Sequence, residues 1–216
     1  MSNILFPEQI LYLEKTLNNV DSLIEEMEKF AYENKIPILE KISANFLEIL
    51  IQIYQPKLFL EIGTAIAYST IRVSKILPNY SKIDTIELSK DNIKLAKEFI
   101  SKSSSSEKIH LIEGNALEVI PQINKIYDFV FLDSDKEDYE KLLDISIEKL
   151  KVGGIILIDN LLWKGFTASK EIPEKLKTST EIIRKFNKYF LNFPGLKSSI
   201  LPIGDGLGLA IKIGEK

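Results

Sequence analysis

Three oxygen-bearing side chains follow neighbouring apolar runs in the second half of the chain. Asp133 follows the run 127–132, and Asp159 and Asn160 follow the run 155–158. Carboxylate and amide oxygens favour Mg²⁺ or another hard divalent cation over zinc, and Mg²⁺ keeps coordination positions open for water or substrate. Two adjacent oxygens of a substrate would fill two of those positions. The bound cation would then make a substrate hydroxyl easier to deprotonate.

Lys136 lies three residues after Asp133 and is placed to accept or relay the proton of such a hydroxyl. With a methyl donor beside the cation, the chemistry would be an in-line methyl transfer, catalysed mainly by positioning and charge stabilisation. Each residue alone has a structural interpretation, because Asp-Asn is a common turn or cap and lysine beside acids usually forms a surface ion pair. The combination of the four residues carries the hypothesis.

A second group of residues predicts a cofactor with a ribose and no phosphate. Gly63 follows the run 57–62 and would let a ligand approach the backbone, and Glu87 is placed to accept hydrogen bonds from both ribose hydroxyls. The Gly-x-Gly-x-x-Gly pattern of pyrophosphate sites is absent, and Glu61 would repel a pyrophosphate. An ammonium group could instead meet Glu61 or Asp133. S-Adenosylmethionine has both properties, whereas a nicotinamide oxidoreductase is disfavoured.

The elements that must position these residues alternate between strands and helices. Near-continuous apolar strands of this kind predict an α/β fold with a parallel sheet covered on both faces. The expected strands are 57–62, 82–87, 108–112, 127–132 and 155–158, and the expected helices are 68–77, 89–99, 116–120 and 137–150. Gly153–Gly154 is expected to separate the last helix from the last strand. A long helix over 173–192 and two antiparallel strands, 196–202 and 207–213, joined by an Asp-Gly turn, would complete the chain.

The first quarter of the chain is helical in pattern. Helices are expected near Pro7, over 20–34, and from Pro37 to about residue 55, the last with an apolar face that includes Leu39. We therefore expect one domain over 1–216, with a helical segment at 1–56 and a Rossmann-like core at 57–216.

Composition excludes several chemistries. The 216 residues include no cysteine and one histidine, His110, so disulfides, a cysteine nucleophile and a Cys/His zinc cluster are excluded. No apolar run approaches a membrane span, and the first residues do not resemble a signal peptide, so we expect a cytoplasmic protein that does not contact membranes. Because the net charge is −3, contact with nucleic acid would require a local basic patch.

With these residues the chain resembles the cation-dependent class I O-methyltransferases, which include the catechol and caffeoyl-CoA O-methyltransferases. The matching pieces lie between Leu60 and Gly206 and are Leu-Glu-Ile-Gly-Thr-Ala-Ile-Ala-Tyr-Ser, Ile-Glu-Gly-Asn-Ala-Leu-Glu, Tyr-Asp-Phe-Val-Phe-Leu-Asp-Ser-Asp-Lys, Gly-Gly-Ile-Ile-Leu-Ile-Asp-Asn and Leu-Pro-Ile-Gly-Asp-Gly. The resemblance implies a Rossmann-like, mostly parallel seven-stranded sheet with a C-terminal antiparallel hairpin and N-terminal helices.

The resemblance also implies roles for individual residues. Asp133, Asp159 and Asn160 would bind the cation, and Lys136 would be the catalytic lysine. The residues that would line the S-adenosylmethionine site are Leu39, Glu61, Gly63, Ser69, Glu87, Asn115, Ala116 and Asp133. Two positions depart from the family pattern: Ala67 replaces a glycine near the methionine end of the cofactor, and Asn115 replaces an aspartate near the adenine. We expect these departures to alter affinity without loss of function.

Within the family, the sequence is most similar to the bacterial tRNA 5-hydroxyuridine methyltransferases. This likeness rests on softer pieces, Asn34–Glu40, Gly63–Ile66 and Asp159–Gly165. The adjacent O4 and 5-hydroxyl of 5-hydroxyuridine could bind Mg²⁺ as a catechol does, and a base of the tRNA anticodon loop is unstacked and accessible. The basic residues that could meet RNA phosphates are Lys164, Lys170, Lys175, Lys177, Arg184 and Lys185, although such a run is also typical of a solvated helix face.

The same residues are compatible with other functions. The same chemistry could act on a small substrate with vicinal oxygens, such as a catechol or a hydroxycinnamoyl compound. A protein that binds S-adenosylmethionine without catalysis is a third possibility, which the intact cation set disfavours. Family resemblance further implies a homodimer.

Overall fold

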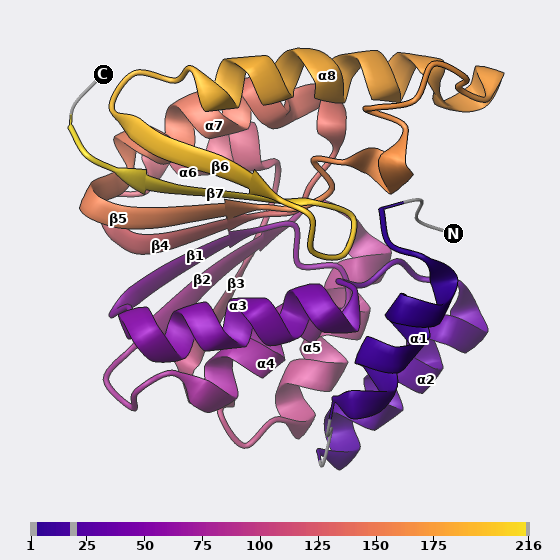
Figure 1. Cartoon of the computed structure of the whole chain (residues 1–216). Helices are drawn as coiled ribbons and strands as arrows, with labels where there is room; N and C mark the ends of the chain where they lie inside the picture. Colours follow the sequence, from indigo (N-terminus) through magenta and orange to yellow (C-terminus); the bar gives the residue numbers. More distant parts are fainter. Residues whose placement is uncertain (1–3, 18–20, 215–216) are drawn as a thin grey trace.

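The centre of the molecule is one sheet of seven strands in the order β3-β2-β1-β4-β5-β7-β6 (Figure 1). The computed structural model describes residues 4–17 and 21–214. The strands are β1 (Leu58–Ile62), β2 (Lys82–Glu87), β3 (Ile109–Glu113), β4 (Tyr127–Leu132), β5 (Leu150–Ile158), β6 (Leu196–Leu201) and β7 (Leu207–Lys212). Strands β1 to β5 pair in parallel, and β7 is antiparallel to both β5 and β6. The expected mostly parallel sheet with an antiparallel C-terminal hairpin is confirmed.

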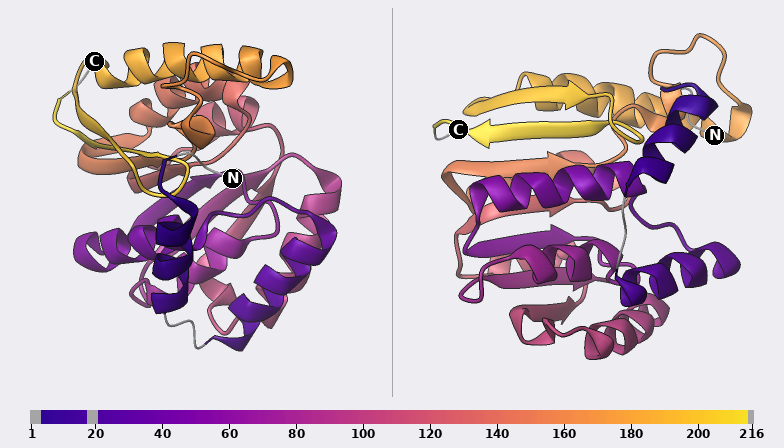
Figure 2. Two further views of the ribbon diagram at one scale, coloured as in Figure 1. Left: turned by 45° about the vertical axis from the view of Figure 1, so that its right-hand side comes forward. Right: turned by 60° about the horizontal axis from the view of Figure 1, so that its bottom comes forward.

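Helices cover both faces of this sheet. In Figure 1, α3, α4 and α5 lie below it and α6, α7 and α8 lie above it. The helices are α1 (Pro7–Thr16), α2 (Ser22–Asn34), α3 (Lys41–Tyr54), α4 (Tyr68–Ile76), α5 (Lys90–Lys102), α6 (Ala116–Gln122), α7 (Tyr139–Glu148) and α8 (Lys177–Leu191). Figure 2 shows the β6–β7 hairpin in yellow at one edge of the sheet. Among the residues that the structure describes, no helix is long and apolar enough to cross a membrane.

The continuous apolar character of the strands follows from burial on both faces. Phe59 of β1 and Phe129 of β4 face the α3–α5 side and stack with ring centroids 5.3 Å apart. Their neighbours Leu60 and Val130 face the α6–α8 side and are equally buried. Since successive strand residues point to opposite faces, both sets must be apolar. Packing on both faces of the sheet thereby fixes the position of the carboxyl end of β1 relative to that of β4.

Two of the predicted boundaries differ from the structure for a clear physical reason. Helix α3 begins at Lys41 rather than at Pro37, and Leu39 lies in the extended segment before it. Leu39 is nevertheless buried, with 4% of its surface exposed, so its hydrophobicity reflects packing against the α3–α5 core and not a place on a helix face. Helical periodicity cannot distinguish these two causes of an apolar residue.

The second difference concerns β5, which runs through Gly153 and Gly154 instead of starting after them. Its pairing with β4 changes register, from Leu150 opposite Tyr127 to Ile155 opposite Phe129. Gly153 has φ +80°, a conformation that glycine adopts readily, and so permits an irregularity within the strand. The glycine pair thus marks a distortion of a strand and not its boundary.

Candidate active site

The carboxyl ends of the central strands remain joined beyond the strands themselves. The backbone N–H of Gly63 donates to Ile86 O (3.1 Å), that of Asp133 donates to Ile62 O (2.9 Å), and that of Asp159 donates to Leu132 O (3.0 Å). The loops after β1, β4 and β5 therefore start in register, beside β2. This arrangement brings the residues predicted from separate motifs to one edge of the sheet, where ligands of open α/β sheets bind.

Asp159 is a buried carboxylate beside a second carboxylate. Only 4% of its surface is exposed. Burial, and then the nearby charge of Asp133, raises its pKa well above the ordinary range. The backbone N–H of Asn160 donates to Asp159 Oδ1 at 2.7 Å. A buried charge beside a like charge is costly unless a cation or a proton offsets it.

Asp133, Asp159 and Asn160 therefore fit a hard divalent cation by donor chemistry and by charge. Among the described residues, no cluster of three or more histidine, cysteine, aspartate and glutamate side chains is arranged to hold a metal. The predicted cation ligands are not such a cluster, because they are two aspartates and one asparagine amide.

Lys136 lies beside the acidic pair, as the sequence predicted. Its Nζ is 3.5 Å from Asp133 Oδ1 and donates to Ser134 O at 2.9 Å. The same ammonium group lies 5.2 Å from the ring centroid of Tyr139 and 6.0 Å from that of Trp163. Two aromatic faces and one carboxylate thus hold the amine at the carboxyl edge of the sheet.

Glu61 is enclosed by hydroxyl groups of the chain itself. Ser69 Oγ and Thr85 Oγ1 each donate to its carboxylate at 2.6 Å, and Thr70 Oγ1 makes a third, shorter contact. Burial raises the pKa of Glu61 to about 7, against the opposing effect of the three hydroxyls. The structure therefore shows Glu61 fixing the start of α4, together with Ser69 from the predicted cofactor set.

Glu87 stands at the end of β2, as predicted, and binds the backbone of two loops. Its Oε2 accepts from Ala65 N (2.8 Å), and its Oε1 accepts from Leu88 N (3.0 Å) and Ser89 N (2.8 Å). These contacts fix the carboxylate between the loop after β1 and the loop after β2. Oε2 keeps capacity for a further donor, since a carboxylate oxygen has two acceptor sites.

The two residues that depart from the family pattern have different local surroundings. Ala67 has φ +69° and is fully buried in the α3–α5 core, so its methyl group packs inward. Asn115 caps α6, because its Oδ1 accepts from Leu117 N at 2.9 Å, and Ala116 is the first residue of that helix. The amide oxygen of Asn115 thus already serves the helix end.

Sequence reasoning missed two residues at this edge, Asp205 and Trp163. Asp205 lies in the β6–β7 turn, is 5% exposed, and accepts from Asn160 Nδ2 at 3.4 Å and from the backbone N–H of Lys164. Trp163 Nε1 is buried and, within the described part of the chain, has no hydrogen-bond acceptor. The local sequence around Asp205 indicates only an Asp-Gly turn, and Trp163 lies within the softer motif Asp159–Gly165.

The predicted basic run divides into engaged and exposed residues. Arg184 donates to the carbonyl oxygens of Phe166, Thr167 and Ser169, and pairs with Glu181. Its guanidinium therefore braces the loop after β5. The other members place their side chains at the surface: Lys164, Lys170, Lys175, Lys177 (which pairs with Glu174 at 2.5 Å) and Lys185.

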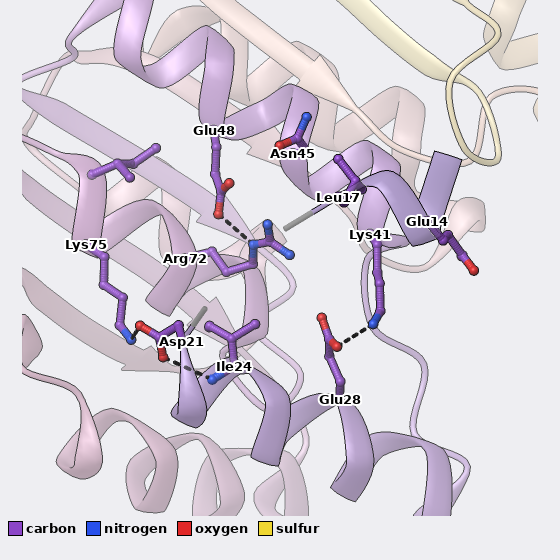
Figure 3. Close-up of a pocket in the computed structure, with 11 residues that line it drawn as sticks. Glu14, Leu17, Asp21, Ile24, Glu28, Lys41, Asn45, Glu48, Arg72 and Lys75 are labelled. Carbon is purple, nitrogen blue, oxygen red and sulfur yellow. Dashed lines mark hydrogen bonds and ion pairs between the residues drawn. The ribbon is translucent and has the colours of Figure 1, made fainter. Parts of the chain in front are cut away.

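A separate cavity of about 370 Å³ lies among the N-terminal helices and α4 (Figure 3). Its basic side chains face acidic ones: Arg72 pairs with Glu48 at 2.6 Å, Lys41 pairs with Glu28 at 2.5 Å, and Lys75 pairs with Asp21. Because each basic group that lines it has an acidic partner, this cavity offers structural ion pairs and no reactive constellation.

His110 is also remote from the carboxyl edge. It lies in β3, where its Nδ1 is 2.9 Å from Asp84 Oδ1. Asp84 is buried and also accepts from Lys125 Nζ and Tyr127 Oη at 2.6 Å each. The single histidine thus belongs to a structural network with Asp84, away from the carboxyl edge.

Comparison with known proteins now gives the family. A family model described as O-methyltransferase matches residues 14–213. Caffeoyl-CoA O-methyltransferase 2 of Populus trichocarpa is 32% identical over 177 residues, which cover 78% of this chain and 72% of the relative.

Solved structures share the fold. A Staphylococcus aureus protein described provisionally as a caffeoyl-CoA O-methyltransferase superposes with TM-score 0.85 at 29% identity, covering 95% of this chain and 98% of that one. An O-methyltransferase from Bacillus cereus in complex with SAH superposes with TM-score 0.82 at 23% identity, covering 95% and 97%. From its sequence and its fold together, the chain belongs to the O-methyltransferase family that includes the caffeoyl-CoA O-methyltransferases.

Proposed function

We propose that this chain is an S-adenosylmethionine-dependent O-methyltransferase that uses a divalent cation and methylates one of two vicinal substrate oxygens. The observation that carries the proposal is the buried Asp159 beside Asp133, with the amine of Lys136 held 3.5 Å from Asp133. A buried carboxylate that feels the charge of a second one favours a bound cation, and the amine beside them would supply a group that holds or passes on a proton.

The cofactor assignment follows from the carboxyl ends of β1 and β2 and from family membership. Glu87 would accept from the ribose, and the loop that contains Gly63 would face the methionine portion. Asn115 and Ala116 at the start of α6 would border the adenine, while Leu39 would cover the cofactor from the segment before α3. SAH, which the Bacillus cereus neighbour contains, is the product of S-adenosylmethionine after methyl transfer.

Asp133, Asp159 and Asn160 would hold the cation, whose charge, when it is bound, would favour loss of a proton from the hydroxyl that is methylated. Lys136 would orient that hydroxyl and hold or pass on its proton. Trp163 would exclude water, because its indole lies against Lys136 on the loop after β5. The remaining contribution is positioning, since the methyl group must lie in line with the attacking oxygen.

We further propose 5-hydroxyuridine in tRNA as the substrate, with 5-methoxyuridine as the product. The support for this finer step is the resemblance in sequence and the exposed Lys170, Lys175 and Lys185, on the segment that links β5 to α8 and on α8 itself. These side chains would meet phosphates while the unstacked base enters the site.

The test is methyl transfer from labelled S-adenosylmethionine to tRNA from a strain that lacks the modification, with a catechol in parallel, each with and without Mg²⁺. Incorporation into tRNA that requires Mg²⁺ and yields 5-methoxyuridine by nucleoside mass spectrometry is the expected result. Transfer that persists in EDTA would contradict the role of the cation.

A second candidate is methylation of a small catechol or hydroxycinnamoyl thioester. The resemblance to caffeoyl-CoA O-methyltransferases favours it. Efficient transfer to the small substrate, combined with none to tRNA, would select this candidate. Because both candidates use the same cation and lysine, the assay separates them by substrate alone.

A further inference from the structure

Asp205 connects the C-terminal hairpin to the loop after β5 through three contacts. Its backbone oxygen accepts from Leu162 N at 3.0 Å. One carboxylate oxygen accepts from the backbone N–H of Lys164, and the other accepts from Asn160 Nδ2 at 3.4 Å. The residue is 5% exposed, so these contacts are sheltered from water. A single buried carboxylate therefore holds both ends of the segment 160–164.

This segment needs such support, because its backbone is strained. Asn160 (φ +66°), Trp163 (φ +46°) and Lys164 (φ +57°) all adopt left-handed conformations. This region is unfavourable for L-residues other than asparagine and aspartate, and three such residues within one short segment persist only where surrounding contacts impose the conformation. The bond from Lys164 N to Asp205 is one contact that imposes it, and it places Trp163 against Lys136.

The second consequence concerns the side-chain amide of Asn160. Its Nδ2 donates to Asp159 Oδ2 at 3.2 Å and to Asp205 Oδ2 at 3.4 Å. A half-turn of the amide about its Cβ–Cγ bond would place the amide oxygen where Nδ2 lies. The oxygen would then face two carboxylate oxygens, which is repulsive. The two carboxylates together therefore fix which end of the amide is nitrogen. The oxygen, which is the end that binds a hard cation, takes no part in these two hydrogen bonds.

We propose that Asp205 is a positioning residue for cation binding, acting through the amide of Asn160. The proposal rests on the proposed function, because it assigns Asn160 to the cation. It adds a residue of the β6–β7 turn to a site otherwise built from the ends of β4 and β5. Residues that orient metal ligands typically affect metal affinity by about 10–100-fold when they are replaced.

The test is a titration of the full-length, metal-free protein with Mn²⁺, with free Mn²⁺ measured by electron paramagnetic resonance. The proteins are wild type, Asp205→Ala, Asn160→Ala and the double variant, with Glu148→Gln as the control. Glu148 is an exposed acid at the end of α7, and its replacement removes one negative charge without touching the site. Thermal unfolding of each protein reports the effect on the fold separately.

We expect Asp205→Ala to weaken Mn²⁺ binding by about tenfold or more. In the Asn160→Ala background, the same replacement should change affinity little, because its effect passes through the amide. An equal loss in both backgrounds would show that Asp205 acts by its charge and would overturn the proposal. Unchanged affinity in Asp205→Ala would also overturn it, whereas a wild type that does not bind Mn²⁺ would overturn the proposed function as well.

Asp205→Asn keeps the experiment decisive if Asp205→Ala does not fold. Asparagine preserves the volume of the side chain but replaces one acceptor oxygen with a donor, so either Asn160 or Lys164 loses its bond. We expect weaker Mn²⁺ binding in a folded protein. Affinity equal to that of the wild type would contradict the role assigned to the two contacts.

Discussion

Gly63 and Asp133 are in direct contact through their main chains. A β-carbon built on Gly63 would lie 1.8 Å from the carbonyl oxygen of Asp133, and Gly63 itself has φ +98°. The loops after β1 and β4, which hold the two halves of the proposed site, can approach this closely only because position 63 has no side chain. A contact within the protein therefore requires glycine at position 63, whether or not a ligand also approaches the backbone there.

We expect Gly63→Ala to destabilise the protein by more than about 3 kcal/mol, since the backbone strain and the overlap with Asp133 add together. The measurement is the free energy of unfolding by denaturant. Gly153→Ala is the matched control, because Gly153 also has a positive φ (+80°) but no atom within 4 Å of the added carbon. That control should lose only about 1–2 kcal/mol. Equal losses in the two variants would show that the contact with Asp133 is unimportant.

The sequence predicted most of the fold and much of the site for a definite reason. Strands such as β2 and β4 were placed at the correct residues because burial on both faces demands an unbroken apolar run between polar ends. Parallel strands then bring their carboxyl ends to one edge, which placed Asp133 and Asp159 together without further information.

What the sequence could not predict depends on contacts between distant segments. Asp205 lies 45 residues from Asn160 and 41 residues from Lys164, so no local pattern reveals that it binds both. Its Asp-Gly context is typical of any tight turn. Likewise, the apolar Leu39 indicated a helix face, whereas its burial comes from packing in an extended segment.

Replacement of Glu61 should change how stability depends on pH. Burial raises the pKa of Glu61 to about 7 from 4.5. As pH rises between these values, the unfolded chain loses the proton first, so this group's contribution to stability is lost progressively, by up to about 3 kcal/mol. Glu61→Gln has no such proton. The difference in the free energy of unfolding, Glu61→Gln minus wild type, should therefore increase from pH 5 to pH 8.

The measurement for Glu61 is denaturant unfolding of both proteins at several pH values without divalent cations. Groups shared by the two proteins cancel in the difference, which isolates Glu61. Glu25→Gln in α2, where the side chain is exposed, is the control and should follow the wild type. Parallel curves for Glu61→Gln and wild type would show that Glu61 is ionised throughout this range.

Lys136→Ala should abolish most methyl transfer while leaving the cofactor bound. Loss of a positioned acid–base group typically costs about 10²–10⁴-fold in rate. The contacts of Lys136 are with Ser134, Asp133 and two aromatic rings, so its removal leaves the loops after β1 and β2 intact. Turnover and S-adenosylmethionine affinity are measured separately. Lys141→Ala, an exposed position on α7, is the control, and near-normal turnover in Lys136→Ala would contradict the catalytic role.

Charge reversal at Lys170 and Lys175 tests the RNA surface. Both side chains are exposed, so the fold should tolerate glutamate at either position. The double variant should bind tRNA more weakly and with a smaller dependence on salt concentration, because fewer counterions are released. Reversal of Lys29 and Lys94, exposed lysines on α2 and α5, changes the net charge equally and serves as the control. Equal loss in the two double variants would indicate a non-specific effect of charge.

Asp159→Asn should stabilise the metal-free protein and remove its response to cations. The pKa of Asp159 is raised by burial and by Asp133, so the ionised carboxylate is held there at a cost. Asparagine removes the charge and keeps the shape, and the variant should therefore melt at a higher temperature than the wild type at pH 8 without metal. Added Mn²⁺ should raise the melting temperature of the wild type by mass action but leave that of the variant unchanged.

A wild type whose melting temperature does not respond to Mn²⁺, or a variant that responds equally, would show that Asp159 is not a cation ligand. A variant that melts lower without metal would show that the bonds Asp159 accepts from Asn160 outweigh the cost of its buried charge.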